Sequence, residues 1–219
     1  MKPNTAGSKS FDLDHQCFFH KTGRGVSVAV VDSGASSGHP HLGAIAGGVA
    51  IGLDEDGDDF VDRLGHGTAV AAAIHEKAPD AALYAVRVFD QSLSATSMQL
   101  VRAIDWASER RVRLINMSLG TANPEREAML GAAVGRAAAQ GALVVAACEF
   151  DGQVWFPGSL PQVVGVMLDP DCPRDEVRLT TDSCSRPAFL ASGLPRPIPG
   201  VPPEGNLQGI SFAVANVTG

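Results

Sequence analysis

Short apolar runs, each about the length of one β-strand, recur along this chain and constrain its fold more than any other feature. Glycine or polar residues bound them, and five such runs span residues 26–31, 83–88, 113–116, 142–147 and 163–167. Strands that are buried on both faces of a parallel sheet typically show near-continuous apolar runs of this kind. The pattern therefore predicts a buried, largely parallel sheet.

Segments with helical periodicity lie between these runs. One follows a capping pair at residues 96–97, and another opens at Asn123-Pro124 and closes at Gly141. Alternation of strands and helices predicts an α/β fold, a doubly wound, mostly parallel sheet with helices on both faces. Residues 170–205 are rich in proline, serine and glycine, which predicts a surface excursion with little regular structure. A helix is expected to open at residues 209–215.

Composition excludes several classes of protein. The chain has 219 residues, with Lys+Arg 17 against Asp+Glu 24, so its formal net charge is −7. This acidic balance argues against a nucleic-acid partner. No apolar run reaches the roughly 18 residues of a membrane span, and the polar residues 1–14 do not resemble a secretory signal. We therefore expect a cytoplasmic protein with no membrane partner, and free thiols at its four cysteines.

Three motifs bring together the residue types of nucleophilic hydrolysis. Asp32 ends the first apolar run, His66 lies between two glycines at a predicted helix start, and Ser211 lies at a second helix start. They supply an orienting carboxylate, a general base and a nucleophile, in the chain order Asp, His, Ser. Neither a G-x-G-x-x-G motif nor a P-loop is present, which disfavours a nucleotide-binding domain.

These motifs resemble those of the subtilisin-like serine proteases, the subtilases. Further matching segments are residues 37–40, 83–88, 115–120 and 156–158. The resemblance covers roughly residues 24–219 and implies a subtilisin-like catalytic domain that is short at its C-terminal end, with residues 1–23 as an N-terminal extension. It implies a peptide or protein substrate. A partner chain or an oligomer that completes the C-terminal region is a further expectation.

The resemblance also implies roles for individual residues. Ser211 would attack the scissile carbonyl, His66 would carry the proton to the leaving amine, and Asp32 would orient the imidazole. The segment Ser118-Leu119-Gly120 would pair with the substrate backbone as an added strand. The implied activity is that of a serine endopeptidase working through an acyl-enzyme, and a dedicated intracellular protease that processes a precursor is our expectation.

Glu149 departs from the family pattern, because it stands where subtilases have the asparagine that donates to the oxyanion. An ionised carboxylate cannot donate and would repel the developing charge. Three interpretations remain open. Glu149 is protonated and donates, it points away while another donor serves, or the protein is a weak or inactive protease. The third makes a pseudoprotease, which binds a peptide or partner without efficient cleavage, the alternative function.

Trp155 is a second departure, at the place where the family commonly has a small residue on the floor of the specificity pocket. An indole there would fill the pocket and favour a small residue before the scissile bond. The alternative is that the loop shifts and Trp155 packs in the core.

No cofactor is expected. In the family's strong calcium site an aspartate follows a His-Pro pair, and here that residue is His41. A separate acidic loop carries alternating carboxylates around a glycine and partly resembles a calcium loop, although it lacks the full spacing. The alternative calcium ligands are Asp54, Asp56, Asp58 and Asp62. The other interpretation is a solvated acidic loop beside His66.

Overall fold

The computed structural model describes residues 21–52 and 55–219. A nine-stranded sheet runs through the molecule in the order β10-β11-β9-β6-β5-β1-β4-β2-β3. All neighbouring strands pair in parallel except β10 with β11 and β2 with β3. The strands are β1 Ser27–Asp32, β2 Gly47–Ile51, β3 Asp56–Gly57, β4 Ala82–Arg87, β5 Leu114–Met117, β6 Leu143–Ala147, β9 Val163–Leu168, β10 Val177–Thr181 and β11 Pro187–Ala191. The predicted doubly wound, mostly parallel α/β fold is confirmed.

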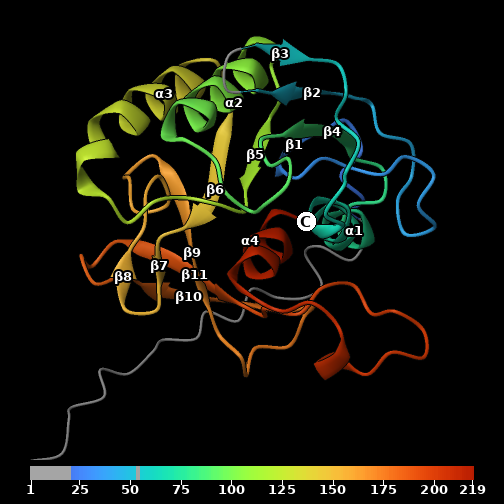
Figure 1. Ribbon diagram of the computed structural model, residues 1–219. Coiled ribbons are helices and arrows are strands. Elements are labelled where there is room, and N and C mark those ends of the chain that lie inside the picture. Colours follow the sequence, from blue (N-terminus) through green and yellow to red (C-terminus); the bar gives the residue numbers. More distant parts are fainter. Residues whose placement is uncertain (1–20, 53–54) are drawn as a thin grey trace, which may run out of the picture.

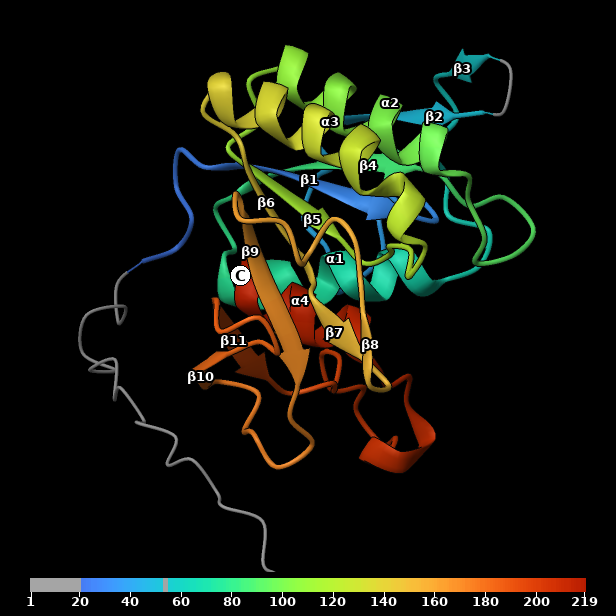
Figure 2. The same cartoon turned by 90° about the vertical axis from the view of Figure 1, so that its left-hand side faces the viewer.

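Helices cover both faces of this sheet (Figure 1). One layer holds α2 and α3, and the other holds α1 and α4, which lie side by side in both views (Figure 2). The helices are α1 His66–Lys77, α2 Ser97–Glu109, α3 Glu127–Ala139 and α4 Ile210–Thr218, with short 3-10 turns at Pro124–Arg126 and Pro203–Gly205.

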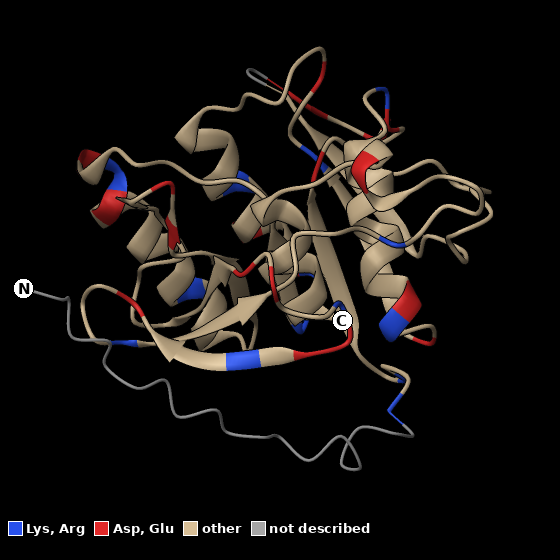
Figure 3. Cartoon of the chain, turned by 90° about the horizontal axis from the view of Figure 1, so that it is seen from below, with Lys and Arg blue, Asp and Glu red and all other residues tan. Residues whose placement is uncertain are grey.

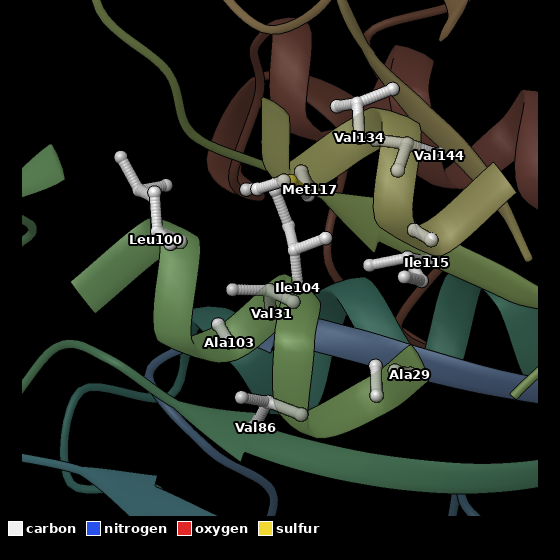
Figure 4. Packing of buried hydrophobic residues seen from close by; sticks show 14 of the residues in the cluster. Ala29, Val31, Val86, Leu100, Ala103, Ile104, Ile115, Met117, Val134 and Val144 are labelled. Atoms are coloured by element: carbon white, nitrogen blue, oxygen red, sulfur yellow. The ribbon is translucent and has the colours of Figure 1, made fainter. Parts of the chain in front are cut away.

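Strand β1 shows why its run is apolar throughout. Ala29 and Val31 point into the cluster under α2 and α3, part of which Figure 4 shows. Val28 and Val30 point into the cluster under α1 and α4. Successive side chains of a strand face opposite sides, so a central strand covered on both faces needs an apolar residue at every position.

The helix starts follow the predicted capping signals. The Thr96 hydroxyl accepts from the Gln99 backbone N–H at 3.2 Å, and the Gln99 side chain accepts from the Thr96 backbone N–H at 2.9 Å. This is a capping box, which satisfies two backbone donors that the helix itself leaves free. Asn123 caps the 3-10 turn that leads into α3.

The region after residue 170 is more regular than predicted. Strands β10 and β11 form an antiparallel hairpin that adds two strands to the edge of the sheet beside β9. Most of its side chains are only partly buried, so it lacks the continuous apolar signal of the central strands. The proline-rich part, residues 195–202, does run as an irregular loop before the last 3-10 turn. Residues 1–20 lie outside the described residues, so the proposed N-terminal extension is not tested.

Candidate functional site

Asp32 and His66 meet at the point where the strand order reverses. Asp32 is the last residue of β1, which has β4 on one side and β5 on the other. Its side chain is fully buried, and its Oδ1 lies 2.7 Å from His66 Nδ1. His66 is the first residue of α1. The carboxyl ends of strands at such a switch point form the usual site of an open α/β sheet.

Ser211 reaches the same place from the first turn of α4. Its hydroxyl donates to the Ser118 carbonyl at 3.2 Å, just beyond the end of β5. The neighbouring Phe212 ring packs against the His66 imidazole, with centroids 5.6 Å apart. The hydrogen bonds found among the described residues do not include one between Ser211 and His66. In proteases without substrate this bond is often long, and it forms in the substrate complex.

The two helices that carry His66 and Ser211 are tied together behind the site. Lys77, at the end of α1, donates to Asn216 Oδ1 of α4 at 2.7 Å. The Asn216 amide donates in turn to the carbonyls of Ser192 and Leu194, at 2.8 and 3.1 Å. These bonds, together with the apolar packing of α1 against α4, hold both catalytic candidates on one rigid support.

The charge environment favours a protonated His66. Burial alone lowers the pKa of this imidazole, but the hydrogen bond and negative charge of Asp32 raise it, and so does the charge of Asp62. The net effect is a pKa above the ordinary histidine value. Because the Asp32 carboxylate accepts from Nδ1, the neutral ring carries its proton there and leaves Nε2 as the basic atom.

Asp62 has a role that the sequence interpretation missed. Its Oδ1 accepts from Ser33 Oγ at 2.9 Å and from the backbone N–H groups of Leu64 and Gly65 at 2.9 and 2.8 Å. Its Oδ2 accepts from the backbone N–H and the hydroxyl of Thr68, at 2.8 and 2.6 Å. Burial raises the pKa of this carboxyl, yet these donors lower it more, so it stays below its usual range. The network ties the end of β1 to the first turn of α1.

Glycine is required where these two segments touch. A side chain at Gly67 would place its Cβ 2.3 Å from the Gly34 carbonyl oxygen, and one at Gly34 would meet the Phe60 carbonyl at 2.2 Å. Gly34 also has a φ of 101°, which other residues rarely adopt. The glycines beside Asp32 and His66 therefore let the two backbones approach closely enough for the 2.7 Å contact. The sequences Asp32-Ser33-Gly34 and His66-Gly67 are the signal from which this approach could have been predicted.

The other candidate calcium ligands have different surroundings. Asp56 forms an ion pair with Arg102, and Asp58 is exposed. Asp54 lies outside the described residues. Within the described part of the chain, no group of three or more His, Cys, Asp or Glu side chains is placed to hold a metal ion. Among the described candidates, only Asp62 accepts hydrogen bonds from protein donors on both carboxylate oxygens, which gives it a structural role.

The predicted substrate-binding segment lies directly beside Trp155. Thr121 and Phe156 exchange two backbone hydrogen bonds of 2.9 Å each. A Cβ at Gly120 would lie 2.5 Å from the Phe156 carbonyl and 3.2 Å from Trp155 Cε3. The indole also contacts the Phe150 ring, at 6.5 Å between centroids. Trp155 therefore narrows the space next to Gly120.

Glu149 has a partner of its own. It is the first residue of β7 (Glu149–Phe150), which pairs with β8 (Gln153–Val154). Its Oε1 accepts from the Ser183 backbone N–H at 2.6 Å, in the turn between β10 and β11. Of the three interpretations, this contact agrees with the one in which the carboxylate is directed elsewhere and another donor serves the oxyanion.

Three of the four cysteines lie in the described part of the chain. Cys148, Cys172 and Cys184 are free, as predicted, and Cys17 lies outside the described residues. Burial, with the nearby charges of Glu149 and Asp182, raises the pKa of the Cys148 thiol to about 11. A thiol of that kind is protonated and unreactive at neutral pH.

Two features of the described residues concern possible binding partners: where the charged residues lie and how long the helices are. Seen from below, Lys and Arg positions and Asp and Glu positions are both scattered over the helices, strands and loops (Figure 3). Among the described helices, none has the length and apolar character needed to cross a bilayer.

Comparison with known proteins gives a consistent set of relatives. The sequence model of the subtilase family matches residues 23–167. Subtilisin E of Bacillus subtilis (strain 168) is 31% identical over 214 residues, which is 90% of this chain and 52% of that protein. An intracellular serine protease of Paenibacillus polymyxa is 37% identical over 163 residues, 66% of this chain and 49% of that protein.

Two further relatives have names that indicate different roles for those proteins. The minor extracellular protease Epr of Bacillus subtilis (strain 168) is 37% identical over 157 residues, 66% of this chain and 23% of that protein. The structure of the prenylagaramide maturation protease PagA superposes with a TM-score of 0.64 at 29% identity, covering 89% of this chain and 72% of that one. The chain thus spans about half or less of the length of the three relatives compared by sequence.

Proposed function

Because the chain belongs to the subtilase family, we propose that it is a serine endopeptidase that cleaves peptide bonds with Asp32, His66 and Ser211. The observation that carries this proposal is the 2.7 Å contact between Asp32 Oδ1 and His66 Nδ1, with Ser211 at the start of the helix packed against His66. A carboxylate, an imidazole and a hydroxyl in this order are the parts that acyl transfer needs.

The proposed reaction begins when a peptide pairs with the segment Ser118-Leu119-Gly120. Ser211 Oγ turns from the Ser118 carbonyl toward His66 Nε2, gives up its proton there and attacks the scissile carbonyl carbon. His66, now an imidazolium paired with Asp32, passes the proton to the leaving nitrogen as the peptide bond breaks. Water, activated by the same imidazole, then releases the acid product from the Ser211 ester.

The formation of the Ser211 ester and its hydrolysis each pass through a tetrahedral intermediate, and the negative charge on the oxygen of that intermediate has to be stabilised. The Ser211 backbone N–H, in the first turn of α4, is one proposed donor, since helix N-termini present free N–H groups. We propose that Glu149 does not supply the other, because its carboxylate is held by Ser183. A second donor from another group, or catalysis weaker than in other subtilases, follows from this placement.

We propose a precursor peptide as the substrate class. Support comes from the structural relative PagA, which is named a maturation protease, and from the indole of Trp155 beside Gly120, which favours small side chains over the broad range a digestive protease accepts. A cytoplasmic location stays a prediction, since the relatives include proteins named intracellular and extracellular.

The alternative is a pseudoprotease that binds a peptide or a partner. Glu149 at the oxyanion position is the observation that favours it. It would retain the Ser118-Leu119-Gly120 segment for binding and would fail to form an acyl-enzyme.

A serine-reactive fluorophosphonate probe separates the two functions. We expect the wild-type chain to be labelled at Ser211, with labelling lost in Ser211→Ala and slowed by at least about 10³-fold in His66→Ala and Asp32→Asn. Ser94→Ala, at an exposed serine outside the proposed triad, is the control and is labelled like the wild type. Labelling that persists in Ser211→Ala would overturn the assigned nucleophile, and a folded wild-type chain that is never labelled would favour the pseudoprotease.

A further inference from the structure

Asn116 is the one polar residue of β5, a central strand with β1 on one side and β6 on the other. Ile115 and Met117 point into the cluster under α2 and α3, so Asn116 points to the opposite face of the sheet, which α1 and α4 cover (Figure 1). Its side chain is fully buried. A buried amide costs free energy unless its donors and its acceptor are paired, so the contacts of Asn116 indicate what this residue does.

Both ends of the Asn116 amide have a partner. The Thr218 hydroxyl, in the last turn of α4, donates to Asn116 Oδ1 at 2.9 Å. Asn116 Nδ2 donates to the hydroxyl oxygen of Ser118 at 3.0 Å. Thr218 therefore fixes the direction of the amide, because the amide oxygen turns to the hydroxyl donor and leaves the N–H groups facing Ser118.

Ser118 is thus held from two directions by one helix. Its carbonyl accepts from the Ser211 hydroxyl in the first turn of α4 at 3.2 Å. Its own hydroxyl is held through Asn116 by Thr218 in the last turn. Ser211 and Thr218 lie about two helical turns apart, which places both on the face of α4 that is turned to β5.

The two bonds behave differently during the proposed reaction. Ser211 Oγ leaves the Ser118 carbonyl when it turns to His66, and the carbonyl then accepts a backbone N–H of the paired substrate. The bond from Ser211 is therefore lost at the stage when Ser118 has to be in place. Among the side-chain hydrogen bonds of the described residues, the one from Asn116 is then the bond that still holds Ser118.

Building on the proposed peptidase function, we infer that Thr218 and Asn116 are positioning residues for the substrate. They hold Ser118 so that its carbonyl binds a backbone N–H of the acyl half while Ser211 attacks. Neither residue touches the substrate or the reacting atoms, so their whole effect passes through Ser118.

Thr218→Val tests this inference with little disturbance, because valine has nearly the shape of threonine but no hydroxyl. Thr218→Ser keeps the hydroxyl and is the conservative rescue. Ser108→Ala is the matched control. The Ser108 hydroxyl is buried in α2 and donates to the Ile104 carbonyl, four residues earlier, at 2.7 Å. The Thr218 hydroxyl likewise lies 2.9 Å from the Val214 carbonyl, but α2 belongs to the other helix layer.

Two measurements with one alanine-rich peptide give the effect. The wild-type chain and its variants give kcat and KM, with the cleaved bond identified by mass spectrometry. In the uncleaving Ser211→Ala background, which removes the bond from Ser211 to Ser118, fluorescence anisotropy gives Kd. Three analogues of the peptide each carry one N-methylated amide, at the first, second or third residue before the cleaved bond, and so lack a single backbone donor.

Thr218→Val should raise KM and weaken Kd by about three- to tenfold, which is the contribution of one hydrogen bond. Its kcat should change by less than about twofold, because the contact is present both before and during the transition state. Thr218→Ser and Ser108→Ala should leave KM and Kd unchanged.

Two further comparisons show whether the effect passes through Ser118. One N-methylated analogue, which lacks the donor for the Ser118 carbonyl, should bind equally well with and without Thr218→Val, whereas a merely structural role would weaken all analogues alike. Ser118→Ala removes the other end of the hydrogen-bonded chain, so Thr218→Val should have no further effect in that background.

The inference is wrong if Thr218→Val binds the peptide like its parent, if its effect adds fully to that of Ser118→Ala, or if Ser108→Ala weakens binding as much. The binding data also keep it separate from the proposed function. If the pattern of Kd values appears but the wild type neither cleaves peptides nor reacts with the fluorophosphonate probe, the peptidase proposal fails and Thr218 still positions a peptide-binding segment. If the wild type cleaves the peptide and Thr218→Val changes neither KM nor Kd, the peptidase proposal stands and this inference fails.

Discussion

Replacing Asp62 by asparagine is the most informative single change, because Asp62 joins the strand of Asp32 to the helix of His66. An asparagine side chain keeps one acceptor oxygen, which can serve Ser33 and the two loop N–H groups. Its amide group then faces the backbone N–H and hydroxyl of Thr68, which now reach Oδ2 at 2.8 and 2.6 Å. Two donors lose their acceptor.

The expected loss of stability follows from these contacts. A hydrogen bond to a charged acceptor contributes about 1.5–3 kcal/mol when buried. Asp62 is only half-buried, so solvent screening reduces the value, and we expect Asp62→Asn to lower the free energy of unfolding by about 2 kcal/mol at pH 7. For a chain of this size that corresponds to a Tm about 4–8 °C lower.

Acid should narrow this difference in stability. The donors hold the pKa of Asp62 below its unfolded value, so its contribution is present above the unfolded pKa and is lost as pH falls through the folded one. Asparagine does not titrate. The unfolding free energies of wild type and variant should therefore differ fully at pH 7 and converge below about pH 4.

The pH dependence of activity should also change in Asp62→Asn, independently of the loss of stability. The negative charge of Asp62 raises the pKa of His66, so its removal lowers that pKa and frees the general base at lower pH. The acid limb of kcat/KM is expected to shift to lower pH in Asp62→Asn, while the plateau falls because the start of α1 is less firmly held.

Urea unfolding followed by circular dichroism, and kcat/KM against pH on one peptide, measure these effects. Asp58→Asn is the matched control, since Asp58 is an exposed carboxylate on the same loop. The reasoning is refuted if the two variants unfold at the same urea concentration at pH 7 and the acid limb of Asp62→Asn coincides with that of the wild type.

Three further predictions address the departures from the family pattern. Trp155→Gly should raise kcat/KM for substrates with Phe or Leu before the scissile bond by about tenfold, and a wild type that already prefers these residues would contradict the filled pocket. Glu149→Gln should change kcat by less than about threefold at any pH, because its carboxylate is bound to Ser183; removing one oxyanion donor costs about 10²–10³, so a tenfold or greater gain at neutral pH would show that the carboxylate faces the oxyanion. EDTA should leave the Tm within about 2 °C, since no group of three or more His, Cys, Asp or Glu side chains among the described residues is placed to hold a metal that would stabilise the fold, and a large drop in Tm would identify the acidic loop as a metal site.

The central fold could be predicted because its signals are local. An apolar run marks each of five parallel strands, β1, β4, β5, β6 and β9, whereas the parallel strand β2 was not predicted. Thr96 and Asn123 mark the starts of their helices by side-chain hydrogen bonds within four residues. The edge hairpin at 177–191 could not be predicted in this way. Its strands are only partly covered, so their pairing depends on β9 being present and not on an apolar pattern of their own.

For the candidate site, the sequence by itself determined the three residue types, their order and the glycines that let their backbones meet. Only the tertiary structure decided the roles of Asp62 and Glu149, because each is defined by a partner distant in sequence: Ser33 lies 29 residues before Asp62, and Ser183 lies 34 residues after Glu149. The sequence alone does not distinguish a carboxylate that binds a metal from one that faces solvent or accepts backbone N–H groups. The role of the carboxylate depends on which donors the fold brings within about 3 Å of its oxygens.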